Sequence, residues 1–296
     1  MKLSHVTKEI DKHVILEDIN FELFENEIVG LIGRNGSGKT TLFRTIAGHY
    51  RTDGGEMIID GQNIETDPLH RQNIFYIDDK ENFLGQYSLK KLNAFYRAIY
   101  PNFDQDTFLN LIREHELPIN LSYRRMSKGM QGLFQMILAI SSNAKYLLLD
   151  EPFDGLDVIV RKKVIRLLLE NLSEGRRTAL IASHNLNELE NIIDRALLLK
   201  GSTLSRDYRL EELREHAKKI QMVFKTKKVP EIIKQNSKAL DFQGRVVTAL
   251  FENFTVELES QIKELEPLVF EELPLTLEDL FEANLSQESL VKGVSQ

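Results

Sequence analysis

The sequence predicts an α/β fold built mainly on parallel strands, followed by a small α+β module. Three observations lead to this prediction. From Leu3 to about Leu204, apolar runs suited to buried strands alternate with amphipathic helical stretches. A glycine-rich segment, Gly33–Thr40, joins one such strand to one such helix. Beyond residue 207 the pattern changes to a charged helix followed by short strands and helices. We therefore expect two unequal domains, residues 1–207 and 208–296.

The composition excludes several classes of function. The formal net charge of −7 argues against a broad electrostatic grip on nucleic acid. The absence of cysteine excludes disulfides, iron–sulfur clusters and thiolate zinc sites, and it is compatible with a reducing cytoplasm. No apolar run approaches the roughly eighteen residues of a membrane helix, and the N-terminus lacks the apolar core of a secretion signal. We expect a chain that neither spans a membrane nor is exported by that route.

The glycine-rich segment predicts a binding site for a nucleoside triphosphate. Ile28–Ile32 is suited to a buried strand, and Thr41–Ala47 continues as a helix that stops at Gly48. Between them the chain fits G-x-x-x-x-G-K-[ST], in which backbone N–H groups and the helix N-terminus face phosphate. Lys39 would reach the β- and γ-phosphate oxygens, and Thr40 would hold Mg²⁺. The expected nucleotide ligands are Gly33, Asn35, Gly36, Ser37, Gly38, Lys39, Thr40 and Thr41.

The middle of the chain predicts a helical insert at about residues 80–142. Leu89–Ile99 and Thr107–Leu117 have helical patterns, and the Pro101–Asp104 break separates them. A longer helix is expected from Ser127 to Ser141.

Two carboxylates follow the next predicted strand, Tyr146–Asp150. Asp150 and Glu151 would lie at the carboxyl edge of the sheet, where ligands bind in such folds. Asp150 would hold Mg²⁺ directly or through water, and Glu151 would polarise the water that attacks the γ-phosphate. A strand that simply ends in solvated acids is common, but the glycine-rich segment upstream favours the functional interpretation. Two further strands are expected at Thr178–Ser183 and Ala196–Leu199.

Residues 208–296 have the element order of a ferredoxin-like module, β-α-β-β-α-β with a helix at each end. The expected strands are Ile220–Lys225, Ala239–Gln243, Val246–Glu252 and Leu268–Leu273. The expected helices are Glu211–Lys218, Pro230–Gln235, Val256–Glu264 and Leu277–Glu282. Thr276 and Asp279 fit a capping box at the start of the last helix. This part lacks a phosphate-binding glycine loop and a pair of carboxylates at a strand end, so we expect an accessory or regulatory role.

Met126-Ser127-Lys128-Gly129-Met130-Gln131 resembles the L-S-G-G-Q signature of the ATP-binding cassette (ABC) ATPases. In that family the signature binds the γ-phosphate held by the opposite subunit of a dimer. The resemblance implies that Ser127 supplies a hydroxyl, that Gly129 permits close backbone approach, and that the following helix points its positive end at phosphate. Met126, Lys128 and Met130 depart from the common form, and a serine before a helix is otherwise usually an N-cap.

The resemblance extends over about residues 1–204 and implies a P-loop ABC ATPase domain with a helical subdomain. Gly155-Leu156-Asp157 is similar to the D-loop, in which Asp157 would link the two sites across the dimer. His184, after the strand Thr178–Ser183, is similar to the switch histidine that contacts the γ-phosphate and the attacking water. The implied catalytic residues are Glu151, His184 and Lys39, and the implied Mg²⁺ ligands are Thr40, Asp150 and Asp79.

Two positions depart from the family pattern. Ile10 stands where an aromatic residue usually stacks on adenine, so stacking is either poor or supplied by His13. The glutamine that senses Mg²⁺ and the transport partner falls at Asp79, or at Asp78 if the alignment shifts by one. In either case a carboxylate replaces an amide.

Two segments, Tyr100–Asp104 and Thr276–Phe281, resemble Gram-positive exporter ATPases. Those subunits serve transporters of peptides, antibiotics or amphipathic toxins, including phenol-soluble modulins. The resemblance implies an ATP-hydrolysing subunit that powers export through a separate membrane protein. It would work as a homodimer or as a heterodimer with a related ATPase, in the cytoplasm and peripheral on the inner face of the cell membrane.

Two alternatives are less well supported. One alternative is a soluble cassette ATPase that acts on ribosomes or DNA. The single cassette, the absence of a heptad run and the acidic net charge argue against it. Nucleic acid is therefore not an expected partner. A regulatory subunit without turnover is disfavoured because Lys39, Asp150, Glu151 and His184 are all present.

Overall fold

The structure is a computed structural model that describes residues 1–78, 82–175, 177–226, 229–281 and 283. The chain divides into two compact units. One consists of Met1–His184 and Ile192–Asp207, and the other of Asn185–Asn191 and Tyr208–Gln296. Among the described residues, no helix has the length and apolar character needed to cross a membrane.

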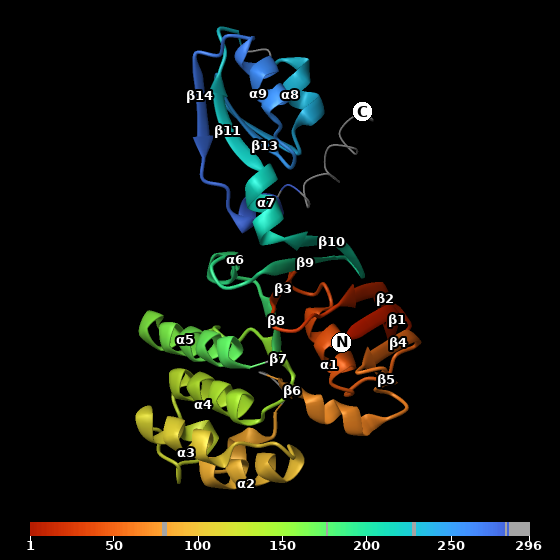
Figure 1. The fold of residues 1–296 in the computed structure, drawn as a ribbon, viewed down its shortest axis with the longest axis vertical. Helices are drawn as coiled ribbons and strands as arrows, with labels where there is room; N and C mark the ends of the chain where they lie inside the picture. The colour runs from red at the N-terminus through yellow and green to blue at the C-terminus, as the bar shows by residue number, and fades with distance from the viewer. Residues whose placement is uncertain (79–81, 176, 227–228, 282, 284–296) are drawn as a thin grey trace. The chain divides into compact units, whose positions relative to one another are not determined.

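A six-stranded sheet forms the centre of the first unit, with the strand order β10-β9-β3-β8-β7-β6 (Figure 1). The five strands from β9 to β6 run parallel. Their nearly continuous apolar sequences fit burial on both faces. The strands are β3 (Ile28–Ile32), β6 (Ile74–Ile77), β7 (Tyr146–Asp150), β8 (Thr178–Ser183), β9 (Arg195–Lys200) and β10 (Thr203–Arg209). The predicted α/β fold with parallel strands is confirmed, and β6 is a strand that the sequence patterns do not single out.

A second, antiparallel sheet has the order β2-β1-β4-β5. Its strands are β1 (Lys2–Ile10), β2 (His13–Glu22), β4 (Gly54–Ile59) and β5 (Gln62–Asn63). The turn between β1 and β2 places Asp11 and Lys12 at φ values of 49° and 65°, as a two-residue hairpin turn requires. Val6 and Leu16 of this sheet share a buried core with Phe43 of the helix α1 (Lys39–Ile46).

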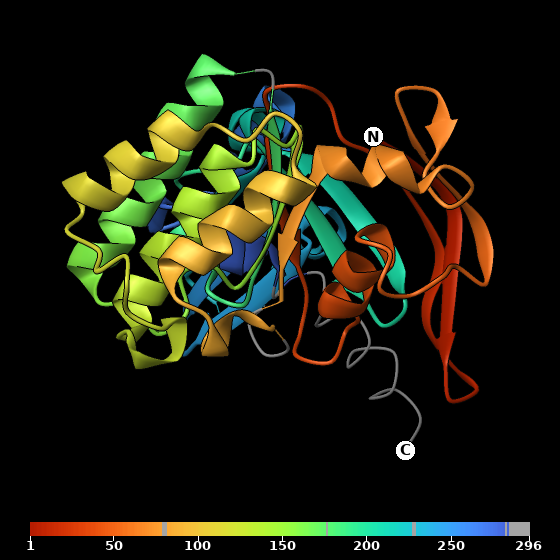
Figure 2. The ribbon, with the colours of Figure 1, turned by 90° about the horizontal axis from the view of Figure 1, so that it is seen from below.

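Four longer helices of the first unit lie together on the side of the central sheet away from the antiparallel strands (Figure 2). They are α2 (Leu89–Ile99), α3 (Gln105–Glu114), α4 (Lys128–Ser141) and α5 (Val158–Glu174). Each begins at a side-chain N-cap, contributed in turn by Ser88, Asp104, Ser127 and Asp157. Short 3₁₀ turns occur at η1 (Pro68–Asn73), η2 (Leu84–Gln86) and η3 (Tyr123–Arg125). The helix expected at 107–117 is observed at 105–114 because Asp104 caps it.

The second unit contains the short helix α6 (Leu186–Leu189) and a four-stranded antiparallel sheet of order β12-β13-β11-β14. The elements after α6 are α7 (Leu210–His216), β11 (Lys218–Val223), α8 (Glu231–Asn236), β12 (Ala239–Gln243), β13 (Val246–Phe251), α9 (Val256–Lys263) and β14 (Val269–Leu273). Their order is the predicted β-α-β-β-α-β. Ile220 and Phe251 of the sheet pack with Ile233 of α8 and Ile262 of α9.

The capping box predicted before the last helix is present. The backbone N–H of Asp279 donates to Thr276 Oγ1 at 3.2 Å, and the backbone N–H of Thr276 donates to Asp279 Oδ2 at 2.9 Å. The helix begins at Leu277, while residue 282, at its predicted end, lies outside the described residues.

Candidate functional site

A cavity of about 530 Å³ lies at the carboxyl edge of the parallel sheet, where β3, β7 and β8 end. It brings together residues that are far apart in the sequence. Its lining consists of Ile15, Asn35, Gly36, Ser37, Gly38, Lys39, Thr40, Thr41, Asp78, Asp150, Glu151, Asp154 and His184. Ligands of parallel α/β sheets bind at this edge.

The glycine-rich loop is shaped to leave backbone N–H groups and one hydroxyl for a ligand. Gly36 and Gly38 have φ values of 81° and 100°, a region that side chains disfavour. A Cβ atom on Gly38 would lie 3.1 Å from the carbonyl oxygen of Ile15, so a larger residue would also push β2 away. The buried Ser37 Oγ has no hydrogen-bond partner among the described residues. Because buried polar atoms rarely stay unpaired, this hydroxyl fits a phosphate oxygen as its partner.

Lys39 is buried at the start of α1 with its ammonium group on the loop carbonyls. Nζ donates to the carbonyl oxygens of Gly33 at 2.7 Å and of Arg34 at 3.3 Å. Burial lowers the pKa of Lys39, while the nearby Glu151 and Asp150 carboxylates act in the opposite direction. Phosphate oxygens form stronger, charge-assisted bonds than neutral carbonyls, so the site fits an anionic ligand.

Thr40 and Asp150 bring together two oxygen atoms that could bind a metal ion. Thr40 Oγ1 donates to Asp150 Oδ2 at 2.7 Å. Burial raises the pKa of Asp150, and the charges of Glu151 and Asp78 act in the same direction. The described residues contain no cluster of three or more metal-binding side chains. A hydroxyl and a carboxylate suit Mg²⁺, which usually completes its shell with water and substrate phosphates. Asp79, the third expected ligand, lies outside the described residues.

Glu151 and His184 meet at the ends of the neighbouring strands β7 and β8. Glu151 Oε2 lies 2.9 Å from His184 Nδ1 and accepts from the His184 backbone N–H at 3.2 Å. Glu151 has a φ of 49°, which is unusual for a residue with a side chain and typical of functional sites. The Glu151 side chain remains 23% exposed, so its carboxylate is accessible to a water molecule.

Ser127, Gly129 and Asp157 do not line this cavity. The Ser127 Oγ caps α4 by accepting from the Met130 N–H at 3.2 Å. The Asp157 carboxylate caps α5 by accepting from two backbone N–H groups at 2.9 and 3.0 Å. A Cβ on Gly129 would lie 3.2 Å from Val160 Cγ2, so glycine lets the start of α4 pack against α5. Within one chain these three residues therefore serve the two helix starts.

The cavity also contains residues that the sequence patterns miss. Ile15 lines it from β2, whereas neither Ile10 nor His13 does. Asp154 adds a carboxylate three positions after Glu151. Asp78, which the sequence offered as the alternative to Asp79, lines the cavity directly after β6. The short spacing from Glu151 is a signal that could have identified Asp154. Ile15 has no such signal, because its position depends on packing between β2 and the glycine-rich loop.

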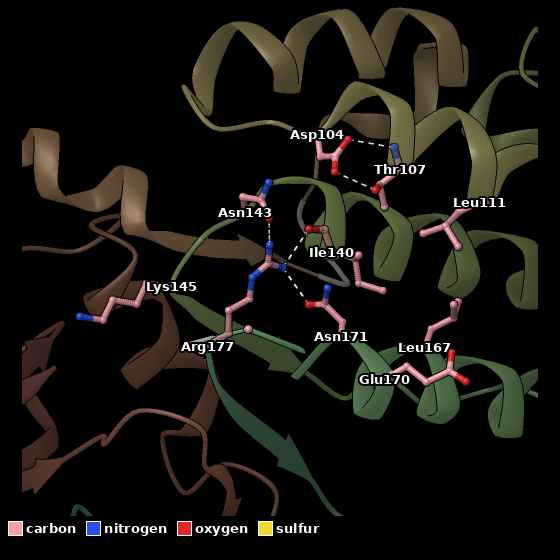
Figure 3. A pocket seen from close by; sticks show the side chains of 11 residues that line it. Asp104, Thr107, Leu111, Ile140, Asn143, Lys145, Leu167, Glu170, Asn171 and Arg177 are labelled. Carbon is pink, nitrogen blue, oxygen red and sulfur yellow. Dashed lines mark hydrogen bonds between the residues drawn. The ribbon is translucent and has the colours of Figure 1, made fainter. Parts of the chain in front are cut away.

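A larger cavity, of about 770 Å³, lies at the opposite edge of the sheet, near the starts of β7 and β8 (Figure 3). Arg177 is buried there and donates to the Ile140 carbonyl oxygen and to Asn171 Oδ1, both at 2.8 Å, and also to Asn143 Oδ1. An arginine at these carbonyls stabilises the C-terminal end of α4. This structural role accounts for the buried arginine.

The comparisons with known proteins agree with this geometry. The family model described as "ABC transporter" matches residues 16–154. Over 281 residues the chain is 36% identical to the ABC transporter ATP-binding protein YtrB of Bacillus subtilis, covering 95% of this chain and 96% of that protein. A solved ATP-binding subunit of an ABC transporter superposes with a TM-score of 0.66 at 23% identity, covering 72% of this chain and 91% of that one. A dimeric ATP-binding cassette in a post-hydrolysis state, bound to ADP and Pi, superposes with a TM-score of 0.62 at 22% identity, covering 71% and 98%.

Proposed function

This chain belongs to the ATP-binding subunits of ABC transporters and is an ABC-type ATPase, and from this premise we propose that it powers export through a separate membrane subunit. The proposed cargo is a peptide, an antibiotic or an amphipathic toxin of the phenol-soluble modulin kind. The observation that carries the chemical part is one cavity that joins a phosphate loop, the Thr40–Asp150 pair and the Glu151–His184 pair.

In this proposal the glycine-rich loop holds the triphosphate. The nucleotide ligands would be Gly33, Asn35, Gly36, Ser37, Gly38, Lys39, Thr40 and Thr41. Lys39 would exchange its loop carbonyls for β- and γ-phosphate oxygens. Thr40 and Asp150, together with Asp79, would hold Mg²⁺, which when bound neutralises charge on the phosphate oxygens.

Glu151 would act on the attacking water. Its carboxylate would accept a hydrogen bond from the water and draw the proton away as the oxygen approaches the γ-phosphorus. His184 would orient this carboxylate through the 2.9 Å contact and would also contact the γ-phosphate. Lys39 would stabilise the negative charge on the transferred group.

The second copy of the ATPase would complete the site. Ser127, Gly129 and Asp157 do not line the cavity of their own chain, although Ser127 and Asp157 are exposed. In a head-to-tail dimer they would reach the nucleotide of the other subunit, which is either the same chain or a related ATPase. Nucleic acid is not a partner in this proposal, in keeping with the net charge of −7.

An exposed aromatic patch offers a surface for the membrane subunit. The patch consists of Phe83, Tyr87 and Phe95, which are 48%, 43% and 44% exposed. The Phe83 ring lies 4.8 Å from Phe95 and 6.2 Å from Tyr87, measured between ring centroids. Clustered exposed aromatic side chains are typical of protein interaction sites. Binding at the patch would keep the ATPase peripheral on the inner face of the membrane.

The chemical roles can be tested with Glu151→Gln and Lys39→Ala in the purified protein. We expect Glu151→Gln to bind Mg·ATP but to lose at least about a hundredfold in hydrolysis rate, because the amide cannot take up a proton. Lys39→Ala should weaken nucleotide binding itself. Glu170→Gln is a matched control, because Glu170 is an exposed carboxylate paired with Arg166. Hydrolysis by Glu151→Gln at the wild-type rate would exclude Glu151 as the base.

The export role can be tested by co-purification and transport. The Phe83→Ser/Phe95→Ser variant should no longer co-purify with the membrane subunit, while it keeps basal ATP hydrolysis. Phe242→Ser is the control, because Phe242 is a 54% exposed aromatic residue on β12. Inside-out vesicles containing the wild-type complex should accumulate an amphipathic peptide only with hydrolysable ATP. Retention on ribosomes without any membrane partner would instead favour the ribosomal alternative.

A further inference from the structure

We propose that Arg44 is a positioning residue of the nucleotide site, which holds the buried Asp78 carboxylate in the cavity wall and compensates its negative charge. Asp78 would then be a structural anion rather than a Mg²⁺ ligand. The inference rests on the proposed Mg·ATP binding in this cavity.

The cavity is rich in carboxylates for a site that takes an anionic nucleotide. Among the described residues, Asp78, Asp150, Glu151 and Asp154 all line it, and Lys39 is the one lysine that does. Asp78 is the most buried of the four, with only 4% of its surface exposed. A buried carboxylate is weakly screened by solvent, so without a partner it would repel the phosphates more strongly than an exposed one.

Arg44 supplies that partner from the helix that carries Lys39. Arg44 Nε lies 2.6 Å from Asp78 Oδ2, and the Tyr76 hydroxyl donates to the same oxygen at 3.1 Å. The Arg44 side chain is 16% exposed, so the pair is largely shielded from water. A second bond, from Arg44 Nη1 to the Tyr50 hydroxyl at 3.0 Å, fixes the other side of the guanidinium. The planar group is therefore held at two points and directed at Asp78.

The pair joins two segments that both line the proposed nucleotide cavity. Arg44 is on α1, which begins with Lys39 and Thr40, and Asp78 directly follows β6. The Asp78 carbonyl oxygen accepts from Asn82 Nδ2 at 2.8 Å, and Asn82 directly precedes Phe83 of the aromatic patch. Arg44 thus fixes Asp78 in the cavity wall, and Asp78 in turn is hydrogen-bonded to the residue that precedes the patch.

The charge argument gives a distinctive pattern of double-variant effects. Removing only the Arg44 charge leaves the buried Asp78 carboxylate uncompensated beside the phosphate site. Removing the Asp78 charge as well takes away this source of repulsion. Arg44→Gln should therefore weaken nucleotide binding, and adding Asp78→Asn should restore it. A purely structural role of Arg44 would give no such rescue, because the second change would remove a further bond.

The test measures the equilibrium dissociation constant of Mg·AMP-PNP by calorimetry on the full-length chain. We expect Arg44→Gln to raise it at least about tenfold, Asp78→Asn to leave it within about threefold, and the double variant to return to within about threefold of the wild type. Arg166→Gln is the matched control, because this exposed arginine on α5 also pairs with a carboxylate, Glu170, at 2.7 Å. If Arg44→Gln fails to fold, Arg44→Lys replaces it and should show a smaller rise that Asp78→Asn again removes.

A titration with Mg²⁺ at saturating AMP-PNP separates the two roles of Asp78. We expect Asp78→Asn to leave the required Mg²⁺ concentration unchanged. An increase of more than about tenfold would make Asp78 a metal ligand and overturn the proposal, as would a double variant that binds no better than Arg44→Gln. Failure of the wild type to bind the analogue would overturn the proposed function instead, so the two failures are distinguishable.

Discussion

Two adjacent carboxylates of this protein have different surroundings. Asp150 is half-buried and accepts a hydrogen bond from the Thr40 hydroxyl, and partial burial raises its pKa, while Glu151 contacts His184. The left-handed backbone of Glu151 separates the two side chains at the end of β7. In the proposed mechanism Asp150 holds Mg²⁺ and Glu151 acts on water, and their different surroundings fit these different roles.

The base-binding side of the cavity leads to a prediction about Ile10. Neither Ile10 nor His13 lines the cavity, so phosphate and Mg²⁺ contacts should dominate binding, and these carry no information about the base. We expect the wild type to prefer ATP over GTP by less than about a hundredfold, or 2.7 kcal/mol. Ile10→Tyr should tighten binding by stacking on the base.

The measurement is the dissociation constant of each Mg·nucleotide for the wild type and the variant. Val14→Tyr is the control, because Val14 is an exposed aliphatic residue on the same hairpin. Val14 directly precedes Ile15 in β2, so its side chain points to the other face of the strand from the cavity-lining Ile15. A wild-type preference for ATP above a hundredfold would mean that another group already recognises the base.

At the scale of elements, side-chain caps determine where the four longer helices of the first unit begin. Side chains cap α2 to α5, and the caps of α4 and α5 belong to the motifs Ser127–Gly129 and Gly155–Asp157. A cap satisfies backbone N–H groups that would otherwise lack partners, and it fixes where the helix begins. The same serine and aspartate can therefore be explained locally before any partner subunit is considered.

The cap of α3 gives a pH-dependent prediction. Asp104 accepts from the Thr107 backbone N–H at 2.9 Å and from its hydroxyl at 2.7 Å, and these bonds hold the pKa of the Asp104 carboxyl below its usual range. A lowered folded-state pKa means that the stabilisation is present above the unfolded pKa, near 4, and is lost as the pH falls through the folded value. We expect Asp104→Ala to lower the free energy of unfolding by about 1 kcal/mol at neutral pH.

Urea unfolding at several pH values would measure this effect. The difference between the wild type and Asp104→Ala should shrink below about pH 4. Asp104→Asn keeps a good cap acceptor, so it should lose less stability than the alanine variant, and its own stability should lack this titration. A difference that stays constant down to pH 2 would exclude the ionised carboxylate as the source of the stabilisation.

The sequence predicts elements best where local signals agree. The strands β3, β7 and β8 are continuous apolar runs, and α2 and α4 have both a cap and an amphipathic pattern, so their bounds are nearly those expected. The strands β1 and β2 are not predicted individually, because register shifts such as that between Leu3 and Val6 break the alternation. In the site, Lys39, Thr40, Asp150, Glu151 and His184 carry motif signals. The positions of Ile15 and Arg44 depend on tertiary packing, which no local pattern shows.

At the scale of the whole molecule, an ion network around a buried arginine marks the end of the first unit. Arg195 on β9 is 4% exposed and binds Asp207 at 2.6 and 3.0 Å and Glu27 at 3.1 and 3.2 Å. Asp207 lies on β10, at the last position before the chain enters the second unit. The nucleotide-binding unit therefore needs β10 to pair this buried arginine fully.

This network predicts where the chain can be truncated. A fragment ending at Ser205 lacks Asp207, and we expect it to be about 2 kcal/mol less stable than a fragment ending at Arg209. Both should bind Mg·AMP-PNP, and Lys39→Ala should weaken that binding, because the described residues of the second unit do not line the nucleotide cavity. Full-length Asp207→Asn should reproduce most of the loss in urea unfolding. A fragment that is folded by circular dichroism but cannot bind the nucleotide would contradict this division.

Residues 185–191 have a consequence for how this protein could be recombined with its relatives. They follow His184 directly, yet they belong to the second unit, so the chain passes between the units three times, after His184, Asn191 and Asp207. A chimaera that takes only the sequence after residue 207 from a relative would keep the original α6. This helix would then have to pack against the relative's second unit. A functional exchange should therefore carry residues 185–191 as well, because the two units are interleaved in the sequence.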